Sequence, residues 1–264
     1  MELTVVGSGT VFPDPDRACA GFYVDAGEAR LLLDCGPGAT RHMARFGLPW
    51  GSLSHVAITH FHTDHTGDLP FLFFALKHAL AQPRSEPLTL LGPTGTMARL
   101  RALADAFGSY VLSPGIRLNV RELGDGHDAE LAPGIVLRAR RTRHTEESLA
   151  YRLEAGAGVV AYTGDTGPDD DLARWLAGGG GGRGGPADLL VTECSLPDAL
   201  GFPGHMTPSG VAALASVARP RRLLLTHVYP QLERSAVPTL VHQAGWPGEV
   251  LMAEDGMRLQ VRNI

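Results

Sequence analysis

The amino-acid sequence predicts an α+β protein in which two sheets pack against each other with helices on the outside. Short apolar or alternating runs, which are typical of strands, fill two separate parts of the chain. Helical patterns follow each of these parts, which indicates that the chain consists of two similar halves. This order differs from the strict alternation of strand and helix in a doubly wound sheet. We therefore expect two layers of sheet covered by helices on both sides.

The first half opens with strand-like runs that are punctuated by Gly, Pro and Asp. A short helical pattern then ends at Gly47, and a later segment, apolar almost all round, predicts a buried helix that Pro83 terminates. In chain order, we expect strands at 3–10, 21–27, 29–36, 54–59 and 87–93, and helices at 37–47, 69–80 and 94–108.

The second half returns to strands before its helices. Acidic residues in the first turn of the pattern at 168–178 support a helix, since negative charge is favourable at a helix N-terminus. The Gly-rich run at 178–186 cannot pack, and we expect it to be a flexible surface loop within a single domain of residues 1–264. In chain order, we expect strands at 116–123, 134–142, 148–155, 158–166, 187–193, 221–227, 249–253 and 256–261, and helices at 168–178, at 207–218 and near Glu233.

The composition is that of an ordinary soluble globular protein, with 44% hydrophobic and 19% charged residues. The formal net charge of -5 argues against a general nucleic-acid surface, so long nucleic acids are not the expected partners. One dense basic cluster lies at 138–144. We interpret it as a strand with Arg on its wet face, and a phosphate-facing patch is the alternative.

Three widely spaced cysteines, Cys19, Cys35 and Cys194, form no disulfide framework, so a reducing compartment fits best. We assign no role to Cys194. The N-terminus shows no signal-peptide pattern, and no apolar run reaches the roughly 18 residues needed to span a membrane. We therefore expect a cytoplasmic protein without membrane contact.

Metal-seeking residues gather in one short stretch, THFHTDHTGDL, directly after an apolar strand pattern. Within its HxHxDH pattern, His60 and His62 lie two residues apart, so in an extended segment they project to the same side and can share one cation. Asp64 and His65 follow where the chain turns into the next helix, and they can reach a second cation. Imidazole and carboxylate are ligands that ions such as Zn2+ accept. A solvated polar loop is the alternative.

A centre of two metals needs further ligands from other strand ends. His144, Asp165 and His227 each terminate a hydrophobic strand pattern. A single residue of this kind is more often a strand-end cap than a functional group. Their joint occurrence with HxHxDH favours a shared metal site.

The order of these segments resembles that of the metallo-β-lactamase superfamily and, more narrowly, its ribonuclease Z-like phosphodiesterase branch. The resemblance covers essentially the whole chain, through LLLDCGPG, THFHTDHTG, RTRHTEESLAYRL, YTGDT, GHMTPSG and LLLTHVYP. It implies the four-layer αββα sandwich of that superfamily, with two mixed sheets flanked by helices.

The resemblance also implies how the ligands divide between two divalent metal ions. The implied sets are His60, His62 and His144 for one metal, Asp64, His65 and His227 for the other, and Asp165 as the bridge. Asp34 in LLLDCG would support the histidine loop from behind. Ligand type favours Zn2+, and Mn2+ also suits this set.

The same resemblance implies hydrolysis with two cations roughly 3.5–4 Å apart, in which a metal-bridging hydroxide attacks phosphorus or a carbonyl carbon. Asp64 would accept the proton of the bridging water. His205 would assist the leaving group, and Glu193 would orient His205. From its local sequence alone, His205 could instead be a loop residue before a helix that is capped by Thr207.

Two features depart from ribonuclease Z itself. That enzyme carries a long tRNA-gripping arm between the positions matching His144 and Asp165, which here lie only 21 residues apart. The segment after His227, VYPQLE, also lacks the arginine that ribonuclease Z has near there.

We therefore expect a metal-dependent phosphodiesterase for small substrates of the cyclic nucleotide or cyclic phosphate type, acting as a homodimer. The first alternative is a carbonyl hydrolase with the same metals, such as a lactonase, thioesterase or β-lactamase-like enzyme. The pair of His205 and Glu193 argues against it, because carbonyl hydrolases of the superfamily generally lack this pair. We also consider a tRNA 3'-end endonuclease and a non-enzymatic metal-binding or scaffold protein. The apolar segment at 69–80 could line a pocket or a dimer interface.

Overall fold

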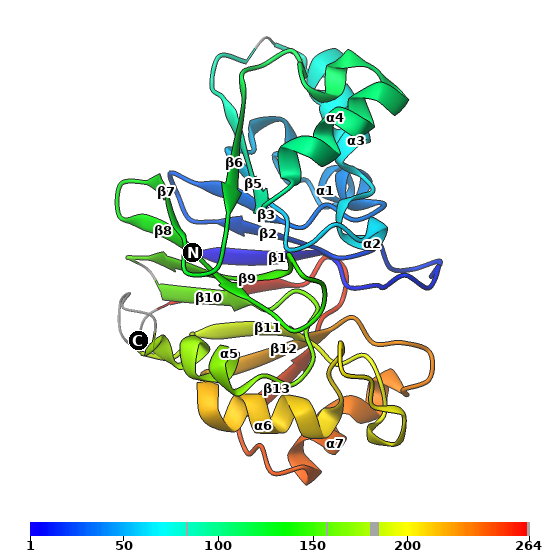
Figure 1. The fold of residues 1–264 in the computed structure, drawn as a ribbon, viewed down its shortest axis with the longest axis vertical. Coiled ribbons are helices and arrows are strands. Elements are labelled where there is room, and N and C mark those ends of the chain that lie inside the picture. The colour runs from blue at the N-terminus through cyan, green and yellow to red at the C-terminus, as the bar shows by residue number, and fades with distance from the viewer. Residues whose placement is uncertain (83, 157, 180–184, 263–264) are drawn as a thin grey trace.

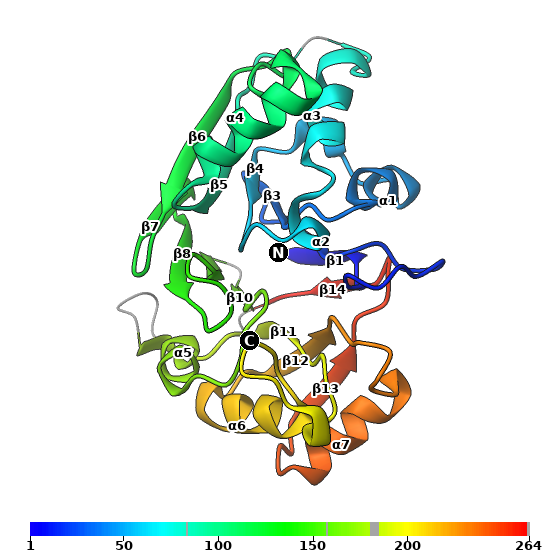
Figure 2. The same cartoon turned by 45° about the vertical axis from the view of Figure 1, so that its right-hand side comes forward.

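The computed structural model describes residues 1–82, 84–156, 158–179 and 185–262. Two mixed sheets of seven strands each pack face to face, and helices cover both outer faces (Figures 1 and 2). The predicted four-layer αββα sandwich is therefore confirmed.

The first sheet is built mainly from the N-terminal half of the chain. Its strands are β1 (Glu2–Gly7), β2 (Gly21–Asp25), β3 (Arg30–Leu33), β4 (His55–Ala57), β5 (Leu88–Pro93), β6 (Leu118–Leu123) and β14 (Arg258–Gln260). They lie in the order β14-β1-β2-β3-β4-β5-β6, antiparallel as far as β3 and parallel from β3 to β6. The helices of this half are α1 (Ala39–Arg45), α2 (Thr63–Thr66), α3 (Leu69–His78) and α4 (Thr96–Phe107).

The second sheet comes from the C-terminal half. Its strands are β7 (Asp128–Ala132), β8 (Ile135–Arg141), β9 (Leu149–Ala155), β10 (Gly158–Tyr162), β11 (Leu189–Glu193), β12 (Arg222–Thr226) and β13 (Glu249–Met252). They lie in the order β13-β12-β11-β10-β9-β8-β7, and the strands from β10 to β13 are parallel. The helices of this half are α5 (Asp170–Arg174), α6 (Pro208–Ala218) and α7 (Val237–Gln243).

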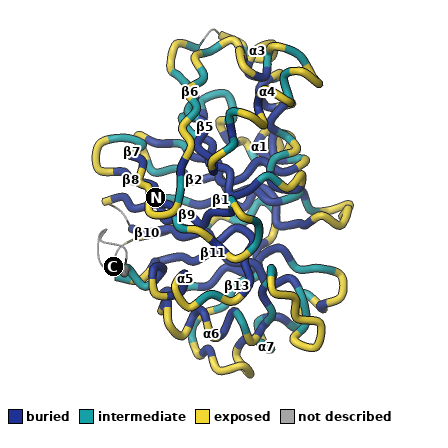
Figure 3. Tube along the Cα trace, viewed as in Figure 1, coloured by how far each residue is buried: buried dark blue, intermediate teal, exposed yellow. Residues whose placement is uncertain are grey.

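Hydrophobic side chains fill the space between the sheets and the space under the helices on each side. Phe22 from the first sheet and Leu137 and Tyr151 from the second are buried in the central layer. Phe73 of α3 packs into the cluster beneath the helices of the first half, and Leu214 of α6 into that of the second half. Figure 3 shows this burial concentrated along the strands. The apolar runs that predicted strands are thus the residues that face the sheet and helix layers.

One strand was not predicted from the sequence. β7 lies at the edge of the second sheet, pairs with β8, and buries Ala129 as its one fully buried residue. An edge strand that is mostly exposed carries polar residues, so its hydrophobic pattern is too weak to recognise.

Several helices are shorter than predicted, among them α3 and α5. α3 ends at His78, and Pro83, which was expected to terminate it, lies outside the described residues. α5 ends at Arg174, and a wider turn follows over Trp175–Gly179, in which Gly178 has a φ of 99°. A left-handed backbone of this kind ends a helix and suits glycine.

The sequence also predicts a flexible loop for the Gly-rich run and a helix near Glu233. Residues 180–184 of the run lie outside the described residues, so its flexibility stays a prediction. Near Glu233, a short turn of 3-10 helix at Arg234–Ala236 leads into α7.

The basic cluster lies mainly on β8, whose inward residues alternate with partly exposed arginines. Arg138 pairs with Asp128 and Arg140 pairs with Asp125 on the wet face of the sheet. The interpretation of this cluster as a solvated strand face is confirmed. None of the helices in the described ranges is long and apolar enough to cross a membrane.

Candidate metal centre

The candidate centre lies where strands of both sheets end on the same side of the sandwich. His60 and His62 follow β4 of the first sheet, and Asp165 and His227 follow β10 and β12 of the second. Because β10, β11 and β12 are parallel, their carboxyl ends meet at one edge. Residues that are far apart in the sequence therefore reach one place.

The histidine loop changes from extended backbone to a helical turn. His62 is extended, with φ of -61° and ψ of 148°, and α2 begins at the next residue. Side chains two apart in an extended segment point the same way, and the rings of His60 and His62 lie 4.6 Å apart between centroids. The turn of α2 then directs Asp64 and His65 to the other half of the centre.

The first group of possible ligands contains His60, His62, His144 and Asp165, whose donor atoms all lie within 4.8 Å of one another. Nε2 of His144 is 3.1 Å from Nδ1 of His62 and 3.7 Å from a carboxylate oxygen of Asp165. His60 is buried, whereas His62 is exposed. This group could hold one cation at the solvent-facing side of the centre.

The second group contains Asp64, His65 and His227, which also place donor atoms within 4.8 Å of one another. All three residues are buried. Oδ2 of Asp64 is 3.2 Å from Nε2 of His227 and 3.7 Å from Nε2 of His65. This group could hold a second cation deeper in the protein.

Asp165 lies between the two groups. Its Oδ1 is 3.4 Å from Nε2 of His65, and its Oδ2 is 3.7 Å from Nε2 of His227 and 3.9 Å from Nε2 of His60. One carboxylate therefore faces histidines of both groups, which is the position that a bridging ligand needs.

Asp34 supports the histidine loop from behind, with its side chain fully buried. It accepts hydrogen bonds from Nδ1 of His65 at 2.7 Å, from the amide of Thr59 at 2.7 Å and from the hydroxyl of Tyr162 at 2.8 Å. The bond to Nδ1 turns Nε2 of His65 toward the centre.

The sequence LLLDCGPG explains how Asp34 reaches this position. Its backbone is left-handed, with φ of 56°. Two residues later, a Cβ on Gly36 would lie 2.1 Å from the carbonyl oxygen of Asp64, so only glycine lets the two segments approach this closely. The amide of Cys35 then donates to the carbonyl of His65 at 2.8 Å, which fixes the loop against β3.

Other groups orient the remaining rings. The hydroxyl of Thr59 lies 3.1 Å from Nδ1 of His60, and Nδ1 of His144 donates to the carbonyl of Gly204 at 2.9 Å. Oγ of Ser195 lies 3.1 Å from Nδ1 of His227. In these three residues Nδ1 has a partner in the protein, so Nε2 is the nitrogen available to a cation.

His205 and Glu193 form a pair beside the two groups. Nδ1 of His205 donates to Glu193 at 2.9 Å, and the fully buried carboxylate also accepts from the amides of Thr166 at 2.7 Å and Met206 at 3.2 Å. The pair is therefore rigidly held. Nε2 of His205 lies 3.3 Å from the hydroxyl of Tyr229.

His205 is also close enough to the second group to act as a ligand. Asp165, His205 and His227 place donor atoms within 4.8 Å of one another. The structure thus offers two roles for Nε2 of His205, as a ligand or as a proton donor to substrate. Its bond to Glu193 serves either role.

Burial and neighbouring charges shift the pKa values of the buried groups, and the two effects oppose each other at His65 and Asp165. Burial, followed by the nearby His65, holds the pKa of His60 well below its usual range. Burial also favours the neutral form of His65, but Asp165 and Asp34 outweigh it and raise the pKa of His65 well above its usual range. Burial would raise the pKa of Asp165, but His227 and His65 lower it well below its usual range. A protonated His65 therefore balances part of the acidic charge, and a cation could replace that proton.

The donor set fits a metal. Nε2 of His60 and Nε2 of His65 are buried and have no hydrogen-bond partner among the described residues. Leaving such an atom unsatisfied costs about 1–3 kcal/mol, and a bound cation would satisfy both. Imidazole nitrogens together with carboxylate oxygens are also a donor set that Zn2+ accepts.

Several supporting residues were not recognised in the sequence. Tyr162 bonds Asp34, Ser195 contacts His227, and Thr59 contacts both Asp34 and His60. Each is a common residue at or near a strand end, and no local pattern separates it from its neighbours. Only its contact with a ligand or with Asp34 reveals its role.

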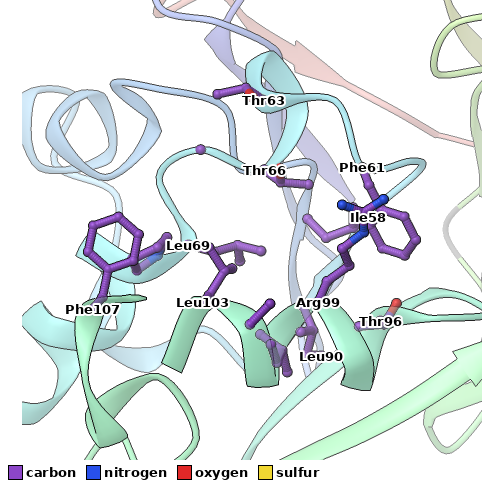
Figure 4. Close-up of a pocket in the computed structure, with 14 residues that line it drawn as sticks. Ile58, Phe61, Thr63, Thr66, Leu69, Leu90, Thr96, Arg99, Leu103 and Phe107 are labelled. Carbon is purple, nitrogen blue, oxygen red and sulfur yellow. The ribbon is translucent and has the colours of Figure 1, made fainter. Parts of the chain in front are cut away.

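The predicted apolar segment does line a pocket. A cavity of about 370 Å³ lies next to the histidine loop, and Phe61, Leu69, Leu103 and Phe107 are among its lining residues (Figure 4). Leu69 belongs to α3, and Arg99 of α4 lies over the ring of Phe61 at 5.1 Å from its centroid. The alternative that this segment forms a dimer interface stays a prediction.

Comparisons with known proteins agree with this geometry. The profile of the beta-lactamase superfamily domain matches residues 29–228, a span that contains both ligand groups. Ribonuclease Z of Haloferax volcanii is 30% identical over 317 aligned positions, which cover 99% of this chain and 95% of that protein.

Two solved structures have closely similar folds. The metallo-beta-lactamase fold protein YhfI from Bacillus subtilis has a TM-score of 0.80 at 24% identity, covering 98% of each chain. The short form of human tRNase Z has a TM-score of 0.79 at 24% identity, covering 100% of each chain. At this identity the likeness concerns the fold.

Proposed function

Because this chain belongs to the beta-lactamase superfamily, in its ribonuclease Z-like branch, we propose that it is a metal-dependent hydrolase that cleaves small phosphodiesters. The substrates would be of the cyclic nucleotide or cyclic phosphate type. The observation that carries this proposal is the buried carboxylate of Glu193, which holds His205 beside both ligand groups. Cleavage of a phosphodiester with an alkoxide leaving group needs such a proton donor.

Two divalent cations fit the centre, and ligand type favours Zn2+. The residues that would hold them are His60, His62 and His144 for one, Asp64, His65 and His227 for the other, and Asp165 between them. When bound, the cations would activate water as a nucleophile and stabilise charge on the phosphoryl oxygens.

Side chains of the protein would accept and donate the protons that move in the reaction. Asp64 would accept the proton of the attacking water, because its carboxylate faces the centre at 3.2 Å from Nε2 of His227. Interactions with His227 and His65 outweigh the effect of burial and hold the pKa of Asp64 below its usual value, so the carboxylate is ionised and able to accept.

His205 would donate a proton to the leaving oxygen. Burial favours its neutral form, but the hydrogen bond and charge of Glu193 outweigh burial and raise the pKa of His205. Its Nδ1 proton is held by Glu193, so the proton on Nε2 is the one that can be transferred. The carboxylate thus both orients the ring and keeps it charged.

A tRNA 3'-end endonuclease is the second candidate, favoured by the identity to the Haloferax volcanii ribonuclease Z. Against it, β9 and β10 pair as an antiparallel hairpin, with Gly158 opposite Ala155, which leaves no room for a long arm between His144 and Asp165. The net charge of -5 also disfavours a large RNA surface. The alignment of 317 positions is longer than this chain of 264 residues, so that relative contains residues that this chain lacks.

The test is turnover by metal-depleted protein that has been reconstituted with Zn2+ or Mn2+. The substrates are bis(p-nitrophenyl) phosphate, a dinucleoside phosphate, a β-lactam, a lactone and a precursor tRNA. We expect hydrolysis of the two diesters. Activity on the β-lactam or lactone alone would contradict the reaction class, and activity on the tRNA alone would favour the endonuclease.

His205→Ala separates the two roles of this residue. We expect both metals to remain, and turnover of the dinucleoside phosphate to fall by about 100-fold or more. Turnover of bis(p-nitrophenyl) phosphate should fall much less, because p-nitrophenolate leaves without a proton. His78→Ala, an exposed histidine at the end of α3, is the matched control. Loss of a metal in His205→Ala would instead identify His205 as a ligand.

A further inference from the structure

A cavity of about 280 Å³ lies beside the candidate centre, between the loop that follows β1 and the segment that follows β12. These two segments project from the same side of the molecule in both ribbon views (Figures 1 and 2). Phe12 and Pro13 line the cavity from the first segment, and Tyr229 and Pro230 from the second. Two aromatic rings, those of Phe12 and Tyr229, therefore share the wall with polar and charged side chains.

Tyr229 connects this cavity to the centre. Its ring lies 5.3 Å from that of His205 and 5.3 Å from that of His227, between centroids. Its hydroxyl lies 3.3 Å from Nε2 of His205, the atom that would protonate the leaving oxygen. A leaving oxygen at Nε2 would therefore lie at the ring that also walls the cavity.

Phe12 and Tyr229 form an aromatic corner. Their ring centroids are 5.1 Å apart and their planes meet at 68°. A flat group placed in this corner can pack its face on one ring and its edge on the other, which are the two favoured aromatic geometries. Phe12 is 39% exposed, so a ligand that covers it removes apolar surface from water.

The two arginines that line the cavity, Arg17 and Arg234, are already paired with carboxylates. Arg17 pairs with Asp14 at 3.0 Å and with Glu254 at 3.5 Å, and Arg234 pairs with Glu254 at 3.2 Å. A cavity that bound a phosphate group would be expected to offer unbalanced positive charge. Because both arginines are paired and the carboxylate of Glu233 also lines the cavity, the site disfavours an anionic ligand and suits a neutral one.

From these observations we propose that the cavity is the subsite for the leaving portion of the substrate, and that this portion carries one flat, neutral ring system of nucleoside size. The cavity lies slightly below the usual range for drug-sized ligands, about 300–1,000 Å³, so it suits one nucleoside better than a longer strand. This inference rests on the proposed function, because the leaving portion is the alcohol side of the phosphodiester that the centre would cleave. The leaving oxygen of a cyclic nucleotide belongs to the same nucleoside, so that substrate also places its base here.

Adenosine is the probe for this subsite. We expect it to inhibit hydrolysis of bis(p-nitrophenyl) phosphate competitively and to show saturation transfer by NMR with the metal-loaded protein. Phe12→Ala should weaken both effects by about tenfold, as expected for the loss of one stacking ring. Phe71→Ala removes a comparably exposed phenylalanine on α3 and should change neither. Ribose, which lacks the base, should bind far more weakly than adenosine.

The outcomes distinguish this inference from the proposed function. If the diester is hydrolysed but adenosine does not bind, or binds equally to the Phe12→Ala variant, the subsite is elsewhere. If adenosine binding depends on Phe12 but no diester is hydrolysed, the cavity is a nucleoside site and its role as a leaving-group subsite is wrong. Phe12→Tyr, which keeps a ring in the corner, should retain adenosine binding.

Discussion

The two ligand groups of the candidate centre differ in how the protein supports them. In the second group, His65 is fully buried and its Nδ1 bonds Asp34, which is itself held by Thr59 and Tyr162. In the first group, His62 is exposed, and its Nδ1 lies against Nε2 of His144. The second group is buried throughout, whereas the first group combines the buried His60 with the exposed His62.

This difference suggests that the two groups differ in metal affinity and in ligand exchange. A buried, braced group loses little conformational entropy when it binds a metal, so we expect the second group to bind more tightly. The first group, which is open to solvent at His62, can exchange ligands with water and substrate more readily. Asp165, which faces both groups, would couple them.

Replacing the shared residue should have the largest effect. We expect Asp165→Ala to lose both metals and to reduce turnover by more than about 100-fold, since even changes behind metal ligands cost 10–100-fold. Elemental analysis would measure the metal content, and hydrolysis of a diester would measure turnover. Retention of two tightly bound metals would show that Asp165 does not bridge the groups.

Removing the exposed ligand should affect one group alone. We expect His62→Ala to retain one metal per chain, held by Asp64, His65 and His227, while losing most turnover. His78→Ala is the control and should keep both metals. If His62→Ala lost both metals, the two groups would not be independent and the comparison between them would fail.

Weakening the support of the second group should have a smaller effect. Asp34→Asn keeps the shape of the side chain but removes the charge that Nδ1 of His65 bonds. We expect a 10–100-fold loss of affinity for the more tightly bound metal, measured by competition with a chelator. Asp105→Asn, an exposed position on α4, is the matched control. An equal loss at both metals would mean that Asp34 supports the whole loop rather than one group.

The smallest expected effect concerns the pH dependence of activity, and it tests the pair of His205 and Glu193. Glu193 raises the pKa of His205, so the acid form persists to higher pH and activity is lost as pH rises through that pKa. Glu193→Gln removes this charge. The loss of kcat for a dinucleoside phosphate should therefore begin at lower pH, with metal content unchanged. An unchanged pH profile would contradict the role of His205 as the proton donor.

Much of the centre could be predicted because its ligand types stand at recognisable places. His60, His62, Asp64 and His65 share one short motif, and His144, Asp165 and His227 each follow a hydrophobic strand pattern. Active-site groups commonly stand at strand ends, so the joint occurrence of these residues favoured a shared site. Their roles as ligands stay predictions until a metal is bound.

Other features could not be predicted, because their hydrophobic pattern is weak or because their role depends on contacts between distant parts of the chain. β7 is an exposed edge strand with little hydrophobic alternation. Tyr162 and Ser195 look like ordinary residues beside their strands, and they become supports only because they face Asp34 and His227. The expected homodimer and cytoplasmic location likewise stay predictions.

The sequence by itself determined the two-sheet layering and the chemical types at the strand ends, because hydrophobic periodicity and ligand spacing are local properties of the chain. The tertiary structure alone decided which nitrogen of each histidine faces the centre. It also decided that Phe12 and Tyr229, more than 200 residues apart, form one aromatic corner. The physical reason is that contacts of this kind depend on how the two sheets and their loops pack, and no local pattern records that packing.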